Sequence, residues 1–340
     1  MTVSERRSIG AGTARQYIRG VRRNLLPVLL ATVIVLWGGA FVAIRIVVRD
    51  ASPLTVGFIR FVLTSIGLIA VTSVVKPPKR TVDRSDWPKL LLLGFCGVTV
   101  YHLALNYGEQ HVSADLASLI VASMPVMVAL LSRAVLHEEV NTTRWVGIGI
   151  ALAGVLVLIL LGTGGVNLHA ESLTGAAVVV LAPTAWAVYT VVSKPLVAKY
   201  GALRLTMLAM VTGTVLLAPV GIPASLRDMG NLTGSDWGWL AFLAFGCSTY
   251  AYTVWFYALG KMPASSLAPW VYFVPGSAIV WAAIVLGEGI TPFLVLGGAM
   301  VLGGVILAER VAPMTARNGL EASSAEDRPD PVRLRPAPDP

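Results

Sequence analysis

The chain has 340 residues, of which 56% are hydrophobic and only 13% are charged, and its mean hydropathy is +0.75. This composition excludes an ordinary soluble globular protein and indicates a chain that lies in a lipid bilayer. The net charge of +8 does not indicate a nucleic-acid partner, because the basic residues are spread over short connectors and the amino-terminal tail.

Ten predominantly apolar stretches follow one another, each about 20 residues long, which is the length that spans the hydrocarbon core. Backbone polar groups in hydrocarbon must be paired inside the protein, so the sequence predicts an all-α integral membrane fold with ten transmembrane helices. The first stretch is too long for a signal-peptide core and has no small-residue cleavage site after it, so we expect it to remain as a helix. The expected ranges are 25–48, 54–75, 88–109, 114–136, 144–162, 172–194, 202–221, 237–259, 264–286 and 290–308.

The distribution of Lys and Arg predicts the orientation. When connectors are assigned to alternate sides, 22 of the 26 Lys and Arg residues fall on the side of the amino-terminal tail. The positive-inside rule therefore predicts a multi-pass protein of the inner (plasma) membrane with both termini in the cytoplasm. The basic tail, 1–24, is expected to be disordered rather than to lie against anionic headgroups. The polar, Pro-rich segment 311–340 is expected to be a disordered cytoplasmic tail.

An internal repeat becomes visible when the chain is shifted by 150 residues. The shift pairs Asp86 with Asp236, Trp87 with Trp237, Tyr107 with Tyr257, Ala114 with Ala264, Pro125 with Pro275, Glu138 with Glu288, Gly147 with Gly297 and Gly154 with Gly304. Because five spans per copy is an odd number, the second copy enters the membrane from the opposite side. The sequence thus predicts two inverted five-helix repeats, 25–162 and 172–308. Inverted repeats are a recurring plan of secondary transporters, whose substrate site lies where the halves meet.

Several segments carry a family resemblance. They are LWGGAFVAIR in the first helix, PLTVGFIRF at the start of the second, NYGEQHVSADLASLIVASMPVMVALLS, and the closing patterns LHEEVNTTRWVGIGIALAGVLVL and LGEGITPFLVLGGAMVLGGVIL. In order and in duplication they resemble the EamA family of the drug/metabolite transporter superfamily, over roughly residues 25–308. The resemblance implies a ten-helix inverted-repeat fold, no ATPase module, and export of amino acids or related metabolites.

Arg60 is an ionisable residue inside a membrane segment, where such residues are costly and functional by default. It lies about two turns into the second helix, roughly 10 Å from its start at 1.5 Å per residue. A guanidinium at this depth can receive a carboxylate of the cargo. The equally weighted alternative is that Arg60 snorkels outward, or pairs with a carboxylate or helix-end carbonyls of the protein.

A polar stripe runs along the third helix. His102, Asn106 and Glu109 share one face by their i, i+4, i+7 spacing and are expected to face the bundle interior, where His102 and Asn106 are predicted to line the substrate cavity. We consider two roles for His102, a structural one and the coupling of transport to protons, in which Glu109 can also take part. Glu109, His111 and Asp115 meet at the junction with the fourth helix, where an exposed, solvated cluster is expected.

Aromatic residues supply further cavity candidates. Trp37, Trp186, Tyr250 and Trp270 lie deep in their helices and are predicted to line a cavity. Tyr252, Trp255, Tyr257 and Tyr272 lie nearer to helix ends and are expected at the membrane interface.

Two prolines and several small residues repeat as well. Pro125 and Pro275 are predicted to kink the fourth and ninth helices, because each removes a backbone donor. Glu138 and Glu288 precede the fifth and tenth helices and are interpreted as caps of those helices. Gly147 with Ala151, and Gly149 with Ala153, permit close helix approach, either within a monomer or in a homodimer.

Other function classes find little support. A nucleotide-sugar or organic-anion carrier of the same superfamily should have several deep cations, and only Arg60 is clearly deep. No HExxH, GxSxG or Walker pattern indicates an enzyme, and the tails are too short and polar for the signalling domain of a receptor. Cys96 and Cys247 lack the spacing of a metal or disulfide site. We therefore expect no cofactor, no metal and no nucleic acid, and as partners a small-molecule substrate and membrane lipid.

Overall fold

The computed structural model describes residues 3–77, 81–136, 142–161, 170–259 and 268–310. Every regular element in these ranges is helical. In the first half the elements are α1 (Val3–Val47), α2 (Pro53–Val75), η1 (Arg84–Asp86), α3 (Trp87–Gly94), η2 (Phe95–Val100), α4 (Tyr101–His111), α5 (Ala114–Val121), α6 (Met124–Leu136) and α7 (Thr142–Leu161). In the second half they are α8 (Ala170–Val179), α9 (Leu181–Tyr200), α10 (Ala202–Asp228), α11 (Gly234–Ala241), η3 (Phe242–Tyr250), α12 (Ala251–Leu259), η4 (Ala268–Phe273), α14 (Val274–Trp281), η5 (Ala282–Leu286) and α15 (Pro292–Arg310).

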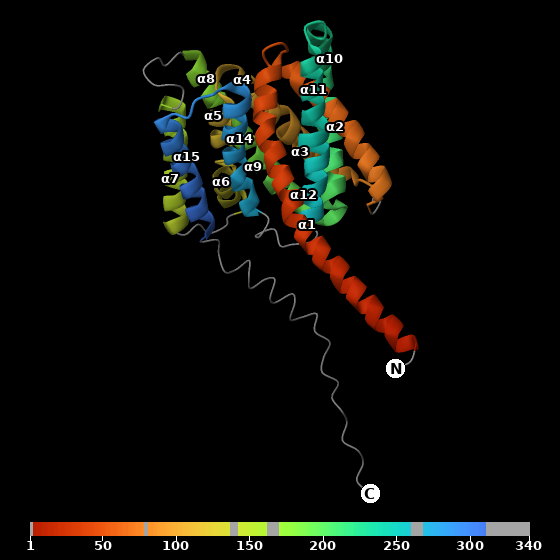
Figure 1. Ribbon diagram of the computed structural model, residues 1–340. Coiled ribbons are helices and arrows are strands. Elements are labelled where there is room, and N and C mark those ends of the chain that lie inside the picture. Colours follow the sequence, from red (N-terminus) through yellow and green to blue (C-terminus); the bar gives the residue numbers. More distant parts are fainter. Residues whose placement is uncertain (1–2, 78–80, 137–141, 162–169, 260–267, 311–340) are drawn as a thin grey trace.

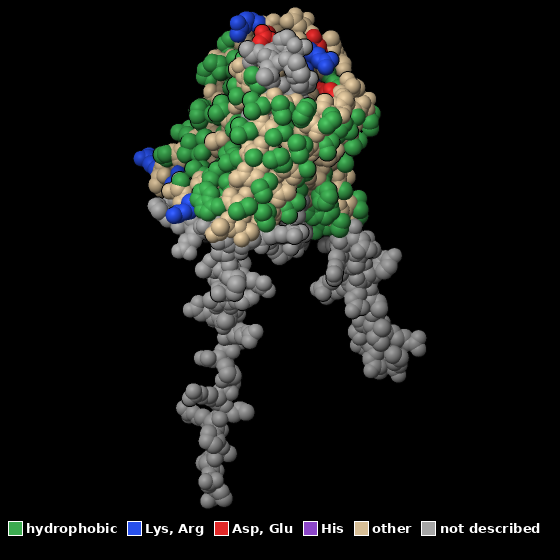
Figure 2. Space-filling view, turned by 90° about the vertical axis from the view of Figure 1, so that its left-hand side faces the viewer, with side chains coloured by type: hydrophobic (Ala, Val, Ile, Leu, Met, Phe, Trp, Pro, Cys, Tyr) green, Lys and Arg blue, Asp and Glu red, His purple; other side chains and the backbone are tan. Residues whose placement is uncertain are grey.

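The helices stand side by side as a bundle (Figure 1). Five helical segments are long and apolar enough to cross a membrane, namely 25–47, 53–75, 84–111, 171–193 and 202–228. Four shorter apolar helices cover 114–128, 145–158, 270–286 and 292–308. On the face drawn in Figure 2, hydrophobic side chains form a broad belt, and the coloured charged groups lie toward its two ends. Such a belt is what lipid tails require of the surface that they cover.

The basic amino-terminal segment differs from the prediction. Helix α1 begins at Val3, so residues 3–24 continue the first apolar helix instead of forming irregular chain. Figure 1 shows this part of α1 projecting beyond the bundle. A helix already formed over residues 25–47 supplies the nucleus that a short isolated segment lacks. The carboxy-terminal segment 311–340, together with Glu138, lies outside the described residues.

Two ends of the bundle can be distinguished by their contacts. We call the end from which the start of α1 projects the N-terminal end of the bundle (Figure 1). Here Lys199 forms ion pairs with Asp83 and Asp86, and the hydroxyl of Tyr200 donates to Asp86 at 2.8 Å. These contacts raise the pKa of Lys199, the hydrogen bond with Asp83 contributing most. Gly201, whose φ of 77° suits glycine, makes the turn from α9 into α10 at this end.

The opposite end, which we call the far end, carries Ser52, Ala114, Asp228 and Glu288. The Asp228 carboxylate accepts hydrogen bonds from Ser52 N at 2.7 Å and from Thr55 Oγ1 at 2.6 Å, at the start of α2. The Glu288 carboxylate accepts from Ala114 N at 3.2 Å, at the start of α5. Both contacts join the second half of the chain to the first. Glu288 therefore caps a helix of the other half, and its assignment to the helix that follows it in the sequence was wrong.

The interruptions in the helices are also paired between the halves. Pro125 and Pro275 are each the second residue of a helix, α6 and α14, and each follows directly on the point where the apolar span is interrupted. Proline fits the first turn of a helix because the N–H that it lacks would have no partner there. The π-helical segments η2 and η3 likewise occupy corresponding places in the two halves, directly before α4 and α12. Such segments are frequent at functional sites.

Candidate functional site

A cavity of about 310 Å³ lies between the two halves of the chain. Helices α1, α2 and α4 supply one part of its wall, and α9, α10 and α12 supply another. A second hollow adjoins it and shares Phe41, Met124, Trp186 and Trp255 with it. The described lining reaches Val197 and Ala202, where α9 meets α10, so the cavity extends toward the N-terminal end. Its size is at the lower end of the range for small-molecule sites.

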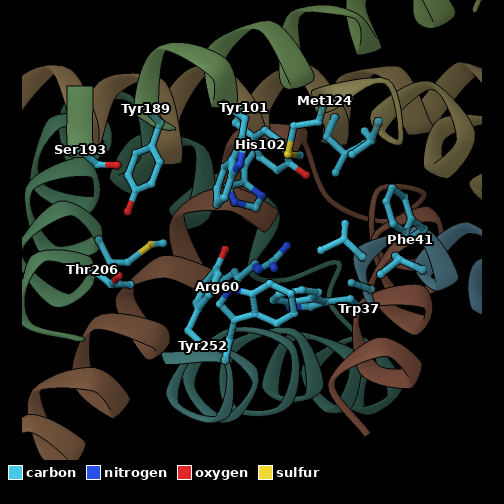
Figure 3. Close-up of a pocket in the computed structure, with 18 of the residues that line it drawn as sticks. Trp37, Phe41, Arg60, Tyr101, His102, Met124, Tyr189, Ser193, Thr206 and Tyr252 are labelled. Atoms are coloured by element: carbon cyan, nitrogen blue, oxygen red, sulfur yellow. The ribbon is translucent and has the colours of Figure 1, made fainter. Parts of the chain in front are cut away.

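Arg60 places a cation in this cavity. Its side chain is only 5% exposed, and in Figure 3 its guanidinium lies between Tyr101 and His102 on one side and Trp37 and Tyr252 on the other. Arg60 Nε and Nη2 both donate to Ser248 Oγ, at 3.3 and 3.2 Å. The ion pairs between described residues do not include Arg60. Arg60 therefore neither snorkels outward nor pairs with a carboxylate of the described chain.

The polar stripe on α4 is buried, but its members have different surroundings. His102 lines the cavity, is 4% exposed and packs against Phe61 and Tyr101, with ring centroids 4.5 and 4.6 Å away. Neither ring nitrogen of His102 has a hydrogen-bond partner among the described residues. Asn106 lies outside the cavity lining and donates from Nδ2 to Pro53 O at 3.2 Å, which ties α4 to the start of α2.

Glu109 is nearer to the far end and is fully buried. Its backbone carbonyl accepts from Arg45 Nη1, whereas both carboxyl oxygens of Glu109 and Nε of Arg45 lack hydrogen-bond partners among the described residues. Asp115 is also buried, at 3% exposure. The expectation of an exposed cluster around Glu109 and Asp115 was wrong, because the second half of the chain packs over this junction. Burial raises the pKa of Glu288, and the carboxylate of Asp115 acts in the same direction.

The predicted aromatic residues separate into two groups. Trp37 and Trp186 line the cavity, and Trp37 Nε1 also donates to Cys247 O at 3.0 Å. Tyr250 and Trp270 are absent from the described lining. Tyr250 is 38% exposed, and its hydroxyl lies 2.9 Å from Thr32 Oγ1. Trp270 packs on the hydrophobic core beside Leu30 and Ala258.

Several cavity aromatics were not predicted, and Phe41 is one of them. Tyr101 and Tyr189 were not considered as lining residues, and Tyr252 and Trp255 were assigned to the membrane interface, yet all four line the cavity. A sequence signal for part of this wall exists, since Tyr252 and Trp255 follow Ser248, the partner of Arg60, at i+4 and i+7 and so share one helical face with it. Depth within the helix was the wrong criterion, because the direction of the side chain decides which residues reach the cavity.

The position of Tyr250 leads to a prediction. Replacing Tyr250 with Phe removes one hydroxyl that contacts Thr32 outside the cavity. We expect transport activity to stay within about twofold of wild type, as for ordinary surface substitutions. The measurement is efflux at matched membrane abundance, with Tyr252→Phe as the comparison inside the cavity. A larger loss from Tyr250→Phe than from Tyr252→Phe would contradict this assignment.

The comparisons with known proteins agree with this architecture. The chain matches the EamA-like transporter family twice, over residues 25–160 and 173–309. It is 33% identical to an "Uncharacterized transporter" of Archaeoglobus fulgidus over 79% of this chain and 93% of that protein. It is 31% identical to the "Probable terminal-alkyne amino-acid exporter" of Streptantibioticus cattleyicolor over 79% of this chain and 88% of that protein.

One solved crystal structure shares the fold, with a TM-score of 0.58 at 20% identity, over 85% of this chain and 98% of the other. Together, the two family matches and the identity to named transporters mean that this chain is a transporter, not an enzyme, and belongs to the EamA-like transporter family.

Proposed function

We propose that the chain is a secondary transporter of the inner (plasma) membrane that exports amino acids or related small carboxylates by alternating access. The observation that carries the proposal is the cation of Arg60, buried in an aromatic cavity between the halves without an ion-pair partner among the described residues. A buried charge without a partner is strongly unfavourable, and an anionic cargo would relieve that cost. The amino-acid exporter among the relatives supports the same cargo chemistry.

We further propose ten spans arranged as two inverted repeats, with both termini in the cytoplasm. Reciprocal helix contacts between the halves support this arrangement. Helix α1 packs on α14 as α9 packs on α6, and α2 packs on η3 as α10 packs on η2. A twofold axis in the membrane plane relates each such pair, as in other inverted-repeat transporters. With this orientation the cavity extends toward the cytoplasmic end of the bundle.

Export is tested by mass spectrometry of the medium around cells that overproduce the protein. We expect one class of small carboxylates to be enriched outside these cells, compared with an empty vector and with an unrelated membrane protein at the same abundance. The cargo is then the enriched class. If the medium is unchanged while labelled amino acids or other carboxylates accumulate inside the cells, the direction of transport is import and the export proposal fails.

Alternating access requires that the far end can open, and the contacts of Asp228 and Glu288 are placed to hold it shut. Hydrogen bonds to a charged group contribute about 1.5–3 kcal/mol each. We therefore expect Asp228→Ala with Glu288→Ala to favour the outward-open state. The measurement places a cysteine at Leu105, a cavity residue, in a background where Cys96 and Cys247 are alanine, and follows its reaction with a membrane-impermeant maleimide added outside.

The double variant should be labelled about tenfold faster or more, since 1.4 kcal/mol corresponds to a factor of ten. Asp50→Asn is the matched control, because Asp50 is an exposed acid at the same end. Equal labelling in all three backgrounds would mean that these contacts do not close the far end.

A further inference from the structure

The described lining of the cavity contains a cationic side chain, Arg60, but no acidic one. Among the described residues, Arg60 donates to Ser248 Oγ alone, through Nε and Nη2, and both ring nitrogens of His102 lack partners. Arginine has five N–H donors in a planar fork that suits a carboxylate. The cavity therefore offers one binding position for an anion, with a second polar contact beside it at His102.

No acidic side chain appears among the described residues that line the cavity. Glu109 is seven residues beyond His102 on the same helix, which places it roughly 10 Å farther toward the far end. There its neighbours include Arg45. Asp86 lies at the N-terminal end and is paired with Lys199. An ammonium group of a cargo bound at Arg60 would thus find no carboxylate in the described wall, and it would lie beside a guanidinium of the same sign.

The remaining wall is mostly apolar or aromatic, with the hydroxyl groups of Ser193 and Thr206 beside these side chains. Its described rings belong to Trp37, Phe41, Tyr101, Trp186, Tyr189, Tyr252 and Trp255. Trp186 and Tyr189 are stacked with an interplanar angle of 25°, and Trp37 and Trp255 lie 5.1 Å apart between centroids. Such rings bind apolar or aromatic groups. Aromatic rings also attract cations, so they could bind the ammonium group of a cargo in place of a carboxylate. The experiment below includes a probe that has only an amine for this reason.

Building on the proposed function, we infer that the cavity recognises its cargo by one carboxylate and an apolar or aromatic body, and does not read a free amine. Carboxylic acids without an amine, such as arylalkanoic and 2-oxo acids, are then better ligands than the amino acids of the same skeleton. Arg60 receives the carboxylate, and His102 contacts one of its oxygens or an adjacent oxo or hydroxyl group. Amino acids bind through the same carboxylate, but their ammonium must leave water without a carboxylate partner in the described wall.

The test compares three probes that share a phenyl ring and a two-carbon chain: 3-phenylpropanoate with only a carboxylate, phenylalanine with both groups, and 2-phenylethylamine with only an amine. Binding to the purified full-length chain in lipid nanodiscs is measured by titration calorimetry. We expect 3-phenylpropanoate to bind, phenylalanine to bind about tenfold more weakly or worse, and 2-phenylethylamine to show no binding. The expected order follows from the cost of burying an unpaired charge.

Two variants identify the site. Arg60→Gln should abolish binding of 3-phenylpropanoate, and Arg60→Lys should retain weakened binding because the charge remains and the fork does not. Arg49→Gln is the matched control, since Arg49 is an exposed arginine at the far end. Size-exclusion profiles establish that each variant is folded.

Three results would overturn the inference: tighter binding of phenylalanine than of the acid, binding of the amine alone, or no binding of the acid to wild type. None of these decides whether the protein exports, because enrichment of carboxylates in the medium is measured separately. Conversely, binding of the acid in the expected order by a protein that exports nothing would sustain the inference about the cavity and defeat the proposed function.

Discussion

Arg60→Gln is expected to reduce efflux about 30-fold or more at equal protein abundance. Removing one partner of a buried, hydrogen-bonded charge pair costs about 2–5 kcal/mol, and 1.4 kcal/mol is a factor of ten. In this case the pair forms only when the cargo binds, so the cost falls on transport and not on folding. The free protein should even gain stability, because a buried cation without an ion-pair partner is replaced by a neutral amide.

The measurement is initial efflux of the enriched carboxylate from preloaded cells, normalised to protein detected in the membrane. Arg60→Lys should retain part of the activity, and Arg49→Gln should match wild type because its guanidinium is exposed. If Arg60→Gln transports at the wild-type rate and is less stable than wild type, Arg60 has a structural role and does not bind the cargo.

Gly304→Ala is expected to destabilise the protein by about 1–3 kcal/mol, the usual cost of overpacking. A Cβ at Gly304 would lie 2.4 Å from Ala151 N and 2.6 Å from Gly147 O, so a backbone would have to move. Gly147 on α7 faces Gly304 on α15. A Cβ at Gly147 would lie 2.5 Å from Ala308 N and 2.7 Å from Gly304 O. The two glycines allow α7 and α15, the last helices of the two halves, to touch along their backbones.

Gly303→Ala is the matched control, because a Cβ there meets nothing within 4 Å. Alanine favours a helix by about 1 kcal/mol over glycine, so this control should be neutral or slightly stabilising. Thermal and SDS-induced unfolding of the purified variants measure the difference. Equal stability of Gly304→Ala and Gly303→Ala would show that α7 and α15 separate readily, and would reopen the possibility that this stripe serves a homodimer.

These glycines show how far sequence reasoning reaches. Their equivalence under the 150-residue shift was visible in the sequence, since Gly147 corresponds to Gly297 and Gly154 to Gly304. The choice between packing within a monomer and in a homodimer was not. In the structure the four glycines meet across α7 and α15 of the same chain.

The sequence alone determined the class of fold, the approximate helix ranges, the repeat and the family. The length of an apolar segment and its repetition can be read directly along the chain. A bilayer requires apolar segments of about 20 residues whose backbone polar groups are paired within the helix. The depth of Arg60, Trp37 and Trp186 in their helices was also predicted from the sequence, and all three residues line the cavity.

The tertiary structure decided which side chains face the cavity and which contacts join the halves. Tyr250 lies deep in its helix but points away from the cavity, whereas Tyr252 and Trp255 point into it. Glu288 caps α5 in the other half, a partner 174 residues away that no local rule indicates. Burial of Glu109 and Asp115 depends on the same packing. Helix rotation and contacts between distant segments follow from how two faces fit together, and one helix's sequence specifies only its own half of that fit.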